Sequence, residues 1–249
     1  MKRKNKACYF CGQPGTSLEH VPSKQMFIAF DCDAITVPSC NKHNNGKSGI
    51  DEAIVKSFLI AIEGDSKRRS LNQNVQSALK AAAHRFDQVK NTVIRGPFVK
   101  NKSDALLSQQ TAFVKDNLGI PIWVTQVTAG LIWDCMQDFE NGNDWSGADS
   151  WSLNYIKQGE NGELSEEEHL RIVTENQVRA NKLLSHDWIE GWSSFPRKYP
   201  SDIYNFKVLF TKERIVFLHE FYADYHWVTG FIASDETRSR IKDKLSASI

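Results

Sequence analysis

The spacing of hydrophobic positions changes near residue 51. Before it, residues 8–50 lack helical periodicity and are rich in Gly, Pro, Asn and Cys, which indicates a small fold of turns and short strands. Within this region a short β-branched run at 34–38 predicts a strand that ends at its proline. From Asp51 onward apolar residues recur at helical spacing up to Gly64, so the pattern predicts a first helix over 51–64.

The rest of the chain predicts further helices and one sheet. Three aromatic and β-branched runs with short polar breaks predict an antiparallel meander near the C-terminus. Ser165 and Glu168 stand at capping-box spacing, and Ser234 is the expected N-cap of a closing helix. The predicted elements are helices over 75–90, 103–119 and 165–186, an extended piece over 120–124 continued by a helix through Phe139, a loop over 141–151, strands over 205–210, 214–222 and 226–233, and a helix over 234–248.

Length and composition indicate a soluble globular protein. The 249 residues allow one large domain or a small module attached to a larger one, and the change of pattern favours parts at 1–64 and 65–249. No run of 18 apolar residues occurs, so we expect no membrane span. The N-terminus is basic but has no apolar signal-peptide region, which predicts an intracellular, cytoplasmic protein.

The net charge of +1 conceals an asymmetry along the chain. Residues 1–102 carry seventeen Lys and Arg against eight Asp and Glu, whereas the remainder carries fourteen against twenty-two. A basic front part joined to an acidic part fits binding of a polyanion such as nucleic acid. The alternative is that solvated charges are segregated by chance.

The cysteines indicate a metal site. Four of the five lie within the first forty residues, and in a reducing compartment such clustering favours metal over disulfides. Cys8 and Cys11 form a C-x-x-C pair, and Cys40 and His43 form a C-x-x-H pair, which together offer four tetrahedral ligands for a structural Zn²⁺. The other two, Cys32 and Cys135, have no partner at ligand spacing, and we expect them to be ordinary buried or half-buried residues.

The residues between the two pairs carry a family resemblance. C-x-x-C, then Glu19-His20 followed by VPSK, then ITVPSC-x-x-H-N-N-x-K, resembles the zinc-bearing members of the HNH endonuclease family over residues 8 to about 52. The resemblance implies a ββα-metal module. The expected fold class is therefore α+β, with a small zinc-bound ββα-metal N-terminal module joined to a larger helical domain with a C-terminal antiparallel β meander.

The resemblance also implies roles for individual residues. His20 takes the place of the general base, and Glu19 that of a carboxylate that binds the catalytic Mg²⁺ or Mn²⁺. Asn44 takes the position of the last histidine of the family motif, where its amide oxygen can bind the same ion. Ile35 stands at the position of the middle asparagine. Thr36 or Asp33 could take over its orienting role, so that role stays unassigned.

Other side chains near the motif have weaker signals. Asp51 is a further candidate ligand for the catalytic ion, although acids at a helix start more often complement the helix dipole. Lys24, Lys42 and Lys47 are the expected phosphate contacts. His219 and His226 have no metal or nucleophile partner at a telling spacing, so we expect them to serve the scaffold.

Three functional hypotheses follow. The first is a metal-dependent HNH-type endonuclease that hydrolyses DNA phosphodiester bonds, in the context of antiphage defence or a mobile element. The second is a zinc-stabilised nucleic-acid-binding or adaptor protein without catalysis. The third is a nuclease kept inactive until a partner or signal engages the acidic C-terminal part. A regulatory protein partner and a homo-oligomer are both open. The sequence does not distinguish DNA from RNA, or nicking from double-strand cleavage.

Overall fold

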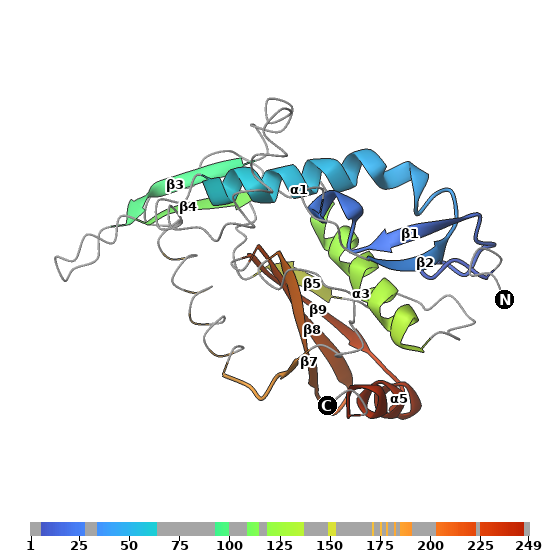
Figure 1. The fold of residues 1–249 in the computed structure, drawn as a ribbon. Helices are drawn as coiled ribbons and strands as arrows, with labels where there is room; N and C mark the ends of the chain where they lie inside the picture. The colour runs from blue at the N-terminus through green and yellow to red at the C-terminus, as the bar shows by residue number, and fades with distance from the viewer. Residues whose placement is uncertain are drawn as a thin grey trace.

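The computed structural model describes residues 6–27, 34–63, 93–99, 109–114, 119–136, 149–152, 185–190, 203–222 and 225–246, and the single positions Arg171, Glu175, Val178 and Lys182. It has helices and antiparallel sheets, which confirms the α+β class (Figure 1). The elements are β1 Ser17–Val21, the 3-10 helix η2 Lys24–Phe27, β2 Ile35–Ser39, the 3-10 helix η3 Asn45–Lys47, α1 Ser48–Glu63, β3 Val93–Val99, β4 Gln109–Val114, α3 Ile120–Met136, β5 Asp149–Ser152, β6 Ile189–Glu190, β7 Tyr204–Phe210, β8 Arg214–Phe221, β9 Tyr225–Ile232 and α5 Asp235–Ser246.

The N-terminal strands and first helix agree with the sequence pattern. β2 covers the predicted strand and pairs antiparallel with β1, so the two form a hairpin. α1 begins three residues before the predicted helix and ends at Glu63, next to the predicted stop. The chain therefore runs β1, β2, α1 through the region of the metal-ligand pairs.

The predicted meander is confirmed as β7, β8 and β9, the centre of a five-stranded sheet with the order β5-β9-β8-β7-β6. Side chains alternate along β8, where Ile215, Phe217, His219 and Phe221 are buried on one face. The predicted loop over 141–151 was wrong for its last three residues. Asp149, Ser150 and Trp151 pair with β9 and form an edge strand, because the sheet supplies hydrogen-bond partners that the local sequence does not reveal.

A second correction concerns the predicted helix over 103–119. Residues 109–114 form β4, which pairs antiparallel with β3 at 93–99, a strand that the sequence pattern did not predict. Thr111, Phe113 and Val114 favour an extended backbone, and a partner strand provides the long-range pairing that realises this preference. Both strands lie beside the end of α1 that is farther from the hairpin (Figure 1).

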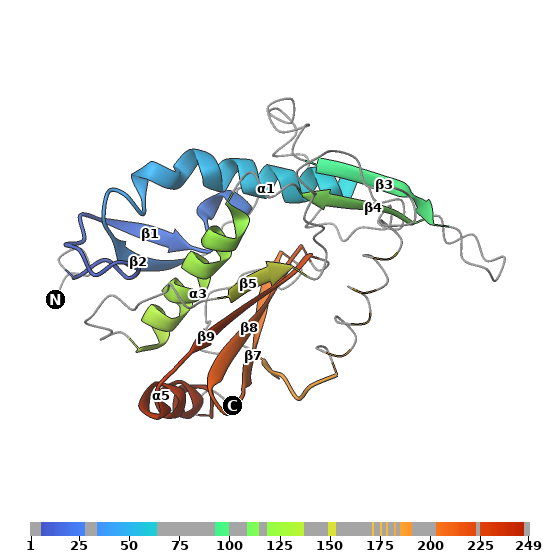
Figure 2. The ribbon, with the colours of Figure 1, turned by 180° about the vertical axis from the view of Figure 1, so that it is seen from behind.

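The third correction concerns the extended piece predicted over 120–124, which is helical. α3 starts directly after Gly119, whose φ of 66° suits glycine, and Pro121 fits the first turn of a helix. The helix is buried on almost all sides, between the hairpin and the five-stranded sheet, so it shows no amphipathic stripe (Figure 2). It approaches β1 closely, since a Cβ on Gly130 would stand 2.6 Å from a methyl group of Val21.

The buried residues of both predicted parts contribute to one core. Phe58 of α1 stacks on Phe221 of β8 with ring centroids 5.4 Å apart, and Trp123 of α3 packs against both rings. The same cluster includes Tyr9, Val21 and Met26 near the N-terminus and Ile241 of α5. The N-terminal hairpin is thus anchored on the sheet through α1 and α3.

Other predictions have partial outcomes. Arg171, Glu175, Val178 and Lys182 are helical, in agreement with the helix over 165–186, whereas its capping box lies outside the described residues, as do Cys32 and the predicted helix over 75–90. Cys135 is buried, as expected. No helix in the part of the chain that the structure describes has the length and apolarity that a membrane span requires.

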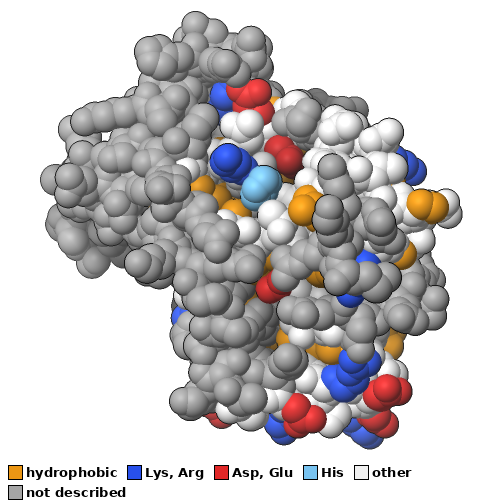
Figure 3. All heavy atoms as spheres, turned by 45° about the vertical axis from the view of Figure 1, so that its right-hand side comes forward, with side chains coloured by type: hydrophobic (Ala, Val, Ile, Leu, Met, Phe, Trp, Pro, Cys, Tyr) orange, Lys and Arg blue, Asp and Glu red, His pale blue; other side chains and the backbone are white. Residues whose placement is uncertain are grey.

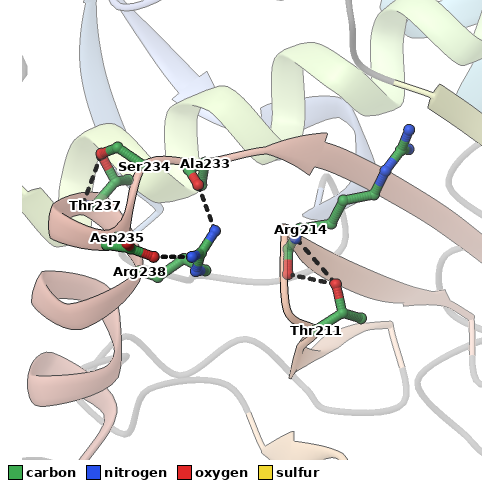
Figure 4. Close-up of polar contacts among 7 residues, drawn as sticks. All are labelled: Thr211, Arg214, Ala233, Ser234, Asp235, Thr237 and Arg238. Carbon is green, nitrogen blue, oxygen red and sulfur yellow. Dashed lines mark hydrogen bonds and ion pairs between the residues drawn. The ribbon is translucent and has the colours of Figure 1, made fainter.

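The closing helix begins as predicted. The Ser234 hydroxyl accepts a hydrogen bond from the backbone N–H of Thr237 at 3.2 Å, while the Arg238 side chain contacts Asp235 and the carbonyl of Ala233 (Figure 4). This is an N-cap that satisfies one of the orphan amides of the first turn.

Replacement of the Ser234 N-cap should lower the stability of the folded protein slightly. We expect Ser234→Ala to lower the free energy of unfolding by about 1 kcal/mol, since an amide of the first turn loses its acceptor. Ser239→Ala, at an exposed position within α5, is the matched control and should be neutral or slightly stabilising. Urea unfolding of both variants measures the difference, and equal midpoints would contradict the capping role.

Candidate metal centre and active site

Cys8, Cys11, Cys40 and His43, here called the zinc cluster, bring their ligand atoms within 4.8 Å of one another. The Sγ atoms of Cys11 and Cys40 are 3.8 Å apart, and His43 Nδ1 lies 3.4 Å from Cys40 Sγ and 3.7 Å from Cys8 Sγ. A regular tetrahedron with Zn–S bonds of about 2.3 Å has edges of about 3.8 Å. The donor set and spacing therefore fit a structural Zn²⁺, as the sequence predicted.

Two tight turns aim these ligands. In the first, the Gly12 amide donates to the Cys8 carbonyl at 3.0 Å, and Gly12 has a φ of 72° that favours glycine. In the second, the amides of His43 and Asn44 both donate to the Cys40 carbonyl, at 3.1 and 3.0 Å. The ring of Phe10 packs edge-on against His43 and shields the cluster. Each pair thus converges because one turn fixes both of its members.

The thiols of the cluster have opposed titration behaviour. Burial raises the pKa of Cys11 to about 11, against a backbone hydrogen bond from Gln13, and the neighbouring thiols add to the rise. Burial also acts to raise the pKa of Cys40, but hydrogen bonds from the His43 backbone and the neighbouring thiols outweigh it and lower that pKa. Thiolates this close together repel one another, which disfavours their deprotonation. A bound divalent cation offsets this repulsion, so metal binding should be accompanied by loss of protons from the thiols.

Glu19 points into the protein interior, where it is 4% exposed. Its Oε1 accepts a hydrogen bond from the Tyr9 hydroxyl at 3.2 Å, and its Oε2 accepts one from the Ser39 hydroxyl at 3.0 Å. Burial and the adjacent Glu19 carboxylate raise the pKa of the Tyr9 phenol, which therefore stays a donor. Both donors are next to residues of the zinc cluster, because Tyr9 lies between Cys8 and Cys11, and Ser39, the last residue of β2, directly precedes Cys40.

Asn44 lies at the edge of β1 that is not paired with β2. Pro38 stands opposite Leu18 and has no N–H, so this pair is of the non-hydrogen-bonded kind and the Leu18 carbonyl points away from β2. Asn44 Nδ2 donates to that carbonyl at 3.2 Å and to Ser17 Oγ at 2.7 Å. Ser17 is on the same face of β1 as Glu19, so the amide of Asn44 and the carboxylate of Glu19 are brought to one side of the hairpin.

His20 follows Glu19 on β1, and its side chain lies on the opposite face, directly across from Thr36. It is half-buried. Desolvation, and next the charge of Lys24, lower its pKa, so the imidazole is neutral at neutral pH. Lys24 is exposed in η2. Figure 3 shows one face of the molecule, on which a histidine side chain lies at the surface beside a basic one.

Asp51 has a structural partner. It is 8% exposed at the start of α1, and its Oδ1 accepts a hydrogen bond from Trp123 Nε1 of α3 at 2.8 Å. This contact joins two helices that are far apart in sequence. The Asp51 carboxylate therefore has a structural role in the packing of α1 on α3. Its role as a ligand of the catalytic ion stays a prediction.

Among the predicted site residues, the structure unites the four zinc ligands and brings Glu19 and Asn44 to one side of β1. Lys42 is exposed in the second turn, while the side chain of Lys47 and all of Asp33 lie outside what the structure describes. Sequence reasoning missed Tyr9, Ser17 and Ser39. Their only sequence signal is adjacency, since Tyr9 and Ser39 neighbour zinc ligands and Ser17 lies two residues before Glu19.

Comparison of the sequence and the structure with known proteins identifies no related protein. No protein-family model matches the chain, and no curated protein or solved structure matches it.

Proposed function

We propose that the protein is a metal-dependent endonuclease of the HNH type that hydrolyses phosphodiester bonds of DNA. The observation that carries this proposal is the contact of Asn44 with the outer edge of β1, beside the adjacent Glu19 and His20. His20 lies on one face of β1 beside this edge, and Glu19 and Asn44 lie toward the other. The order β1, β2, α1 and the zinc cluster agree with the ββα-metal module that the resemblance implies.

The roles follow from the chemistry of the side chains. The neutral imidazole of His20 would take a proton from the attacking water. A carboxylate oxygen of Glu19 and Oδ1 of Asn44 would hold Mg²⁺ or Mn²⁺, hard ions that prefer oxygen ligands, and such an ion supplies charge neutralisation at the phosphate. Lys24 stands beside His20 and would bind an adjacent phosphate, as would Lys42 and Lys47. Cys8, Cys11, Cys40 and His43 would hold Zn²⁺ for structure alone.

His20→Ala tests the proposal. With Mg²⁺, Mn²⁺ or Ni²⁺ present, we expect the wild-type protein to cut plasmid or single-stranded DNA and the variant to lose a factor of about 10²–10⁴ in rate, the usual contribution of a general base. His186→Ala is the matched control, because His186 is an exposed histidine at a distant position in the sequence. An intact substrate with wild-type protein, or equal cutting by His20→Ala, would end the proposal.

A second candidate is a zinc-stabilised nucleic-acid-binding or adaptor protein that does not cut. The observation in its favour is the burial of Glu19, whose two oxygens already accept hydrogen bonds from Tyr9 and Ser39. Binding of DNA without cleavage at any divalent-ion concentration would favour it. If a partner protein or self-association switches cleavage on, the protein is instead a regulated nuclease, as a defence or mobile-element effector would be.

A further inference from the structure

We infer that Tyr9 and Ser39 are positioning residues, which hold the Glu19 carboxylate in the orientation that the catalytic ion requires and so couple this ion to the structural zinc. The inference rests on the proposed function. It assigns two residues that the sequence pattern did not single out, and it gives the zinc cluster a role beyond stabilisation of the fold.

The two hydroxyls reach Glu19 from different zinc-binding turns. Tyr9 lies inside the first turn and is 2% exposed, and Ser39 precedes the first ligand of the second turn and is 0% exposed. Each donates to a different oxygen of the carboxylate, at 3.2 and 3.0 Å. The carboxylate is therefore fixed by both halves of the zinc cluster, and it can take this place only when the two turns are brought together.

Such a two-point contact has a chemical consequence. The terminal torsion of a glutamate is broad, so an isolated carboxylate samples many orientations. Donors on both oxygens, from Tyr9 and Ser39, restrict the plane of this carboxylate. Hydrogen bonds of this kind behind a metal ligand commonly change metal affinity by about 10–100-fold when they are removed.

The same network extends to the second proposed ligand. Ser17 Oγ donates to the Ser39 carbonyl at 3.3 Å and accepts from Asn44 Nδ2 at 2.7 Å. Ser39 thus contacts Glu19 directly through its hydroxyl. Through its carbonyl and Ser17, it is also linked to the side-chain amide of Asn44. The orientation of both oxygen ligands depends on the second zinc-binding turn.

Tyr9→Phe tests the inference, because it removes one oxygen atom and leaves the ring in the core. On zinc-loaded protein without DNA, we expect calorimetry to show a Kd for Mn²⁺ that is raised about tenfold, with unchanged zinc content. In cleavage assays the Mn²⁺ concentration for half-maximal rate should rise by the same factor, while the rate at saturating Mn²⁺ stays near that of wild type. Ser39→Ala should act in the same direction.

Tyr222→Phe is the matched control. Tyr222 is also buried, and its hydroxyl has no hydrogen-bond partner among the described residues, so loss of that oxygen should leave Mn²⁺ affinity unchanged. If wild type binds Mn²⁺ and cuts DNA but Tyr9→Phe has the same Kd, the inference is overturned and the proposed function stands. Loss of zinc from Tyr9→Phe would also overturn it, since the hydroxyl would then serve the fold. Wild-type protein that neither binds Mn²⁺ nor cuts DNA would overturn both.

Discussion

Cys40→Ser is expected to abolish stoichiometric zinc binding and to lower the free energy of unfolding by more than about 4 kcal/mol, a size typical of a lost metal site. Cys40 contacts ligands from both pairs of the cluster, with its Sγ 3.4 Å from His43 Nδ1 and 3.8 Å from Cys11 Sγ. A serine hydroxyl is a poor zinc ligand, so the remaining three side chains would no longer form a tetrahedral site.

The expected effect is large because the four ligands come from two separate turns that the metal would hold together. β1 and β2 have five residues each, and a two-stranded hairpin is marginal in water by itself. The Cys8 amide bonds to Gln13, and Tyr9 is joined to Pro38 through its amide, so the first turn depends on the second strand. Without the metal, the two turns would lose this shared attachment, and the crowded thiols would be left without a common cation.

Zinc analysis and urea unfolding of the purified protein measure the effect. Cys135→Ala is the control, because Cys135 is a buried cysteine outside the zinc cluster, and this variant should keep one zinc ion while losing only part of its packing. A Cys40→Ser protein with full zinc content and near-normal stability would show that the cluster is not a structural metal site.

Local sequence signals predicted those features that local contacts determine. The C-x-x-C and C-x-x-H pairs converge because each is closed by a turn within four residues, and Ser234 caps α5 through a bond to a residue three positions later. The meander was predictable as well, since β7 alternates in burial and the three strands follow one another directly in the chain. In these cases the residues that determine the structure are close to one another in the sequence.

Features that depend on distant partners were not predictable in this way. α3 is buried on almost every side, so no polar face marked its first turn as helical. β4 was predicted as a helix because its strand preference is realised by pairing with β3, which joins residues ten to twenty-one positions apart. The contacts of Glu19 with Tyr9 and Ser39 span ten and twenty residues, and nothing in the spacing of hydroxyl residues distinguishes them from surface serines and tyrosines.

His219 is fully buried in the core, with 0% exposure, whereas His20 is half-buried. Its Nε2 is 2.9 Å from Thr128 Oγ1, and its Nδ1 is 3.0 Å from the Tyr204 hydroxyl. Because the Thr128 hydroxyl donates to the Val124 carbonyl, it must accept from Nε2–H, and Nδ1 then accepts from Tyr204. A second proton on the ring would reverse the Tyr204 contact and place a charge in the core. Burial therefore lowers the pKa of His219 to about 3.

This histidine should make the protein sensitive to mild acid. In the unfolded chain His219 takes up a proton below pH 6.5 or so, whereas the folded protein does not until about pH 3, so stability is full above the higher value and falls as pH decreases between them. We expect its share of the free energy of unfolding to fall by roughly 1 kcal/mol per pH unit in that window. Unfolding by urea at several values from pH 7 to pH 4.5 measures the slope.

His219→Gln separates this contribution from that of the carboxylates, which also titrate in acid. Glutamine can donate and accept but does not titrate in this range, so the variant should be less stable than wild type at pH 7, and the difference should shrink steadily toward pH 4.5. His186→Gln, at an exposed histidine, should run parallel to wild type. A constant difference between His219→Gln and wild type would mean that the buried imidazole takes up its proton over the same pH range in the folded protein as in the unfolded chain. The Tyr204–His219–Thr128 contacts would then need a different arrangement of protons.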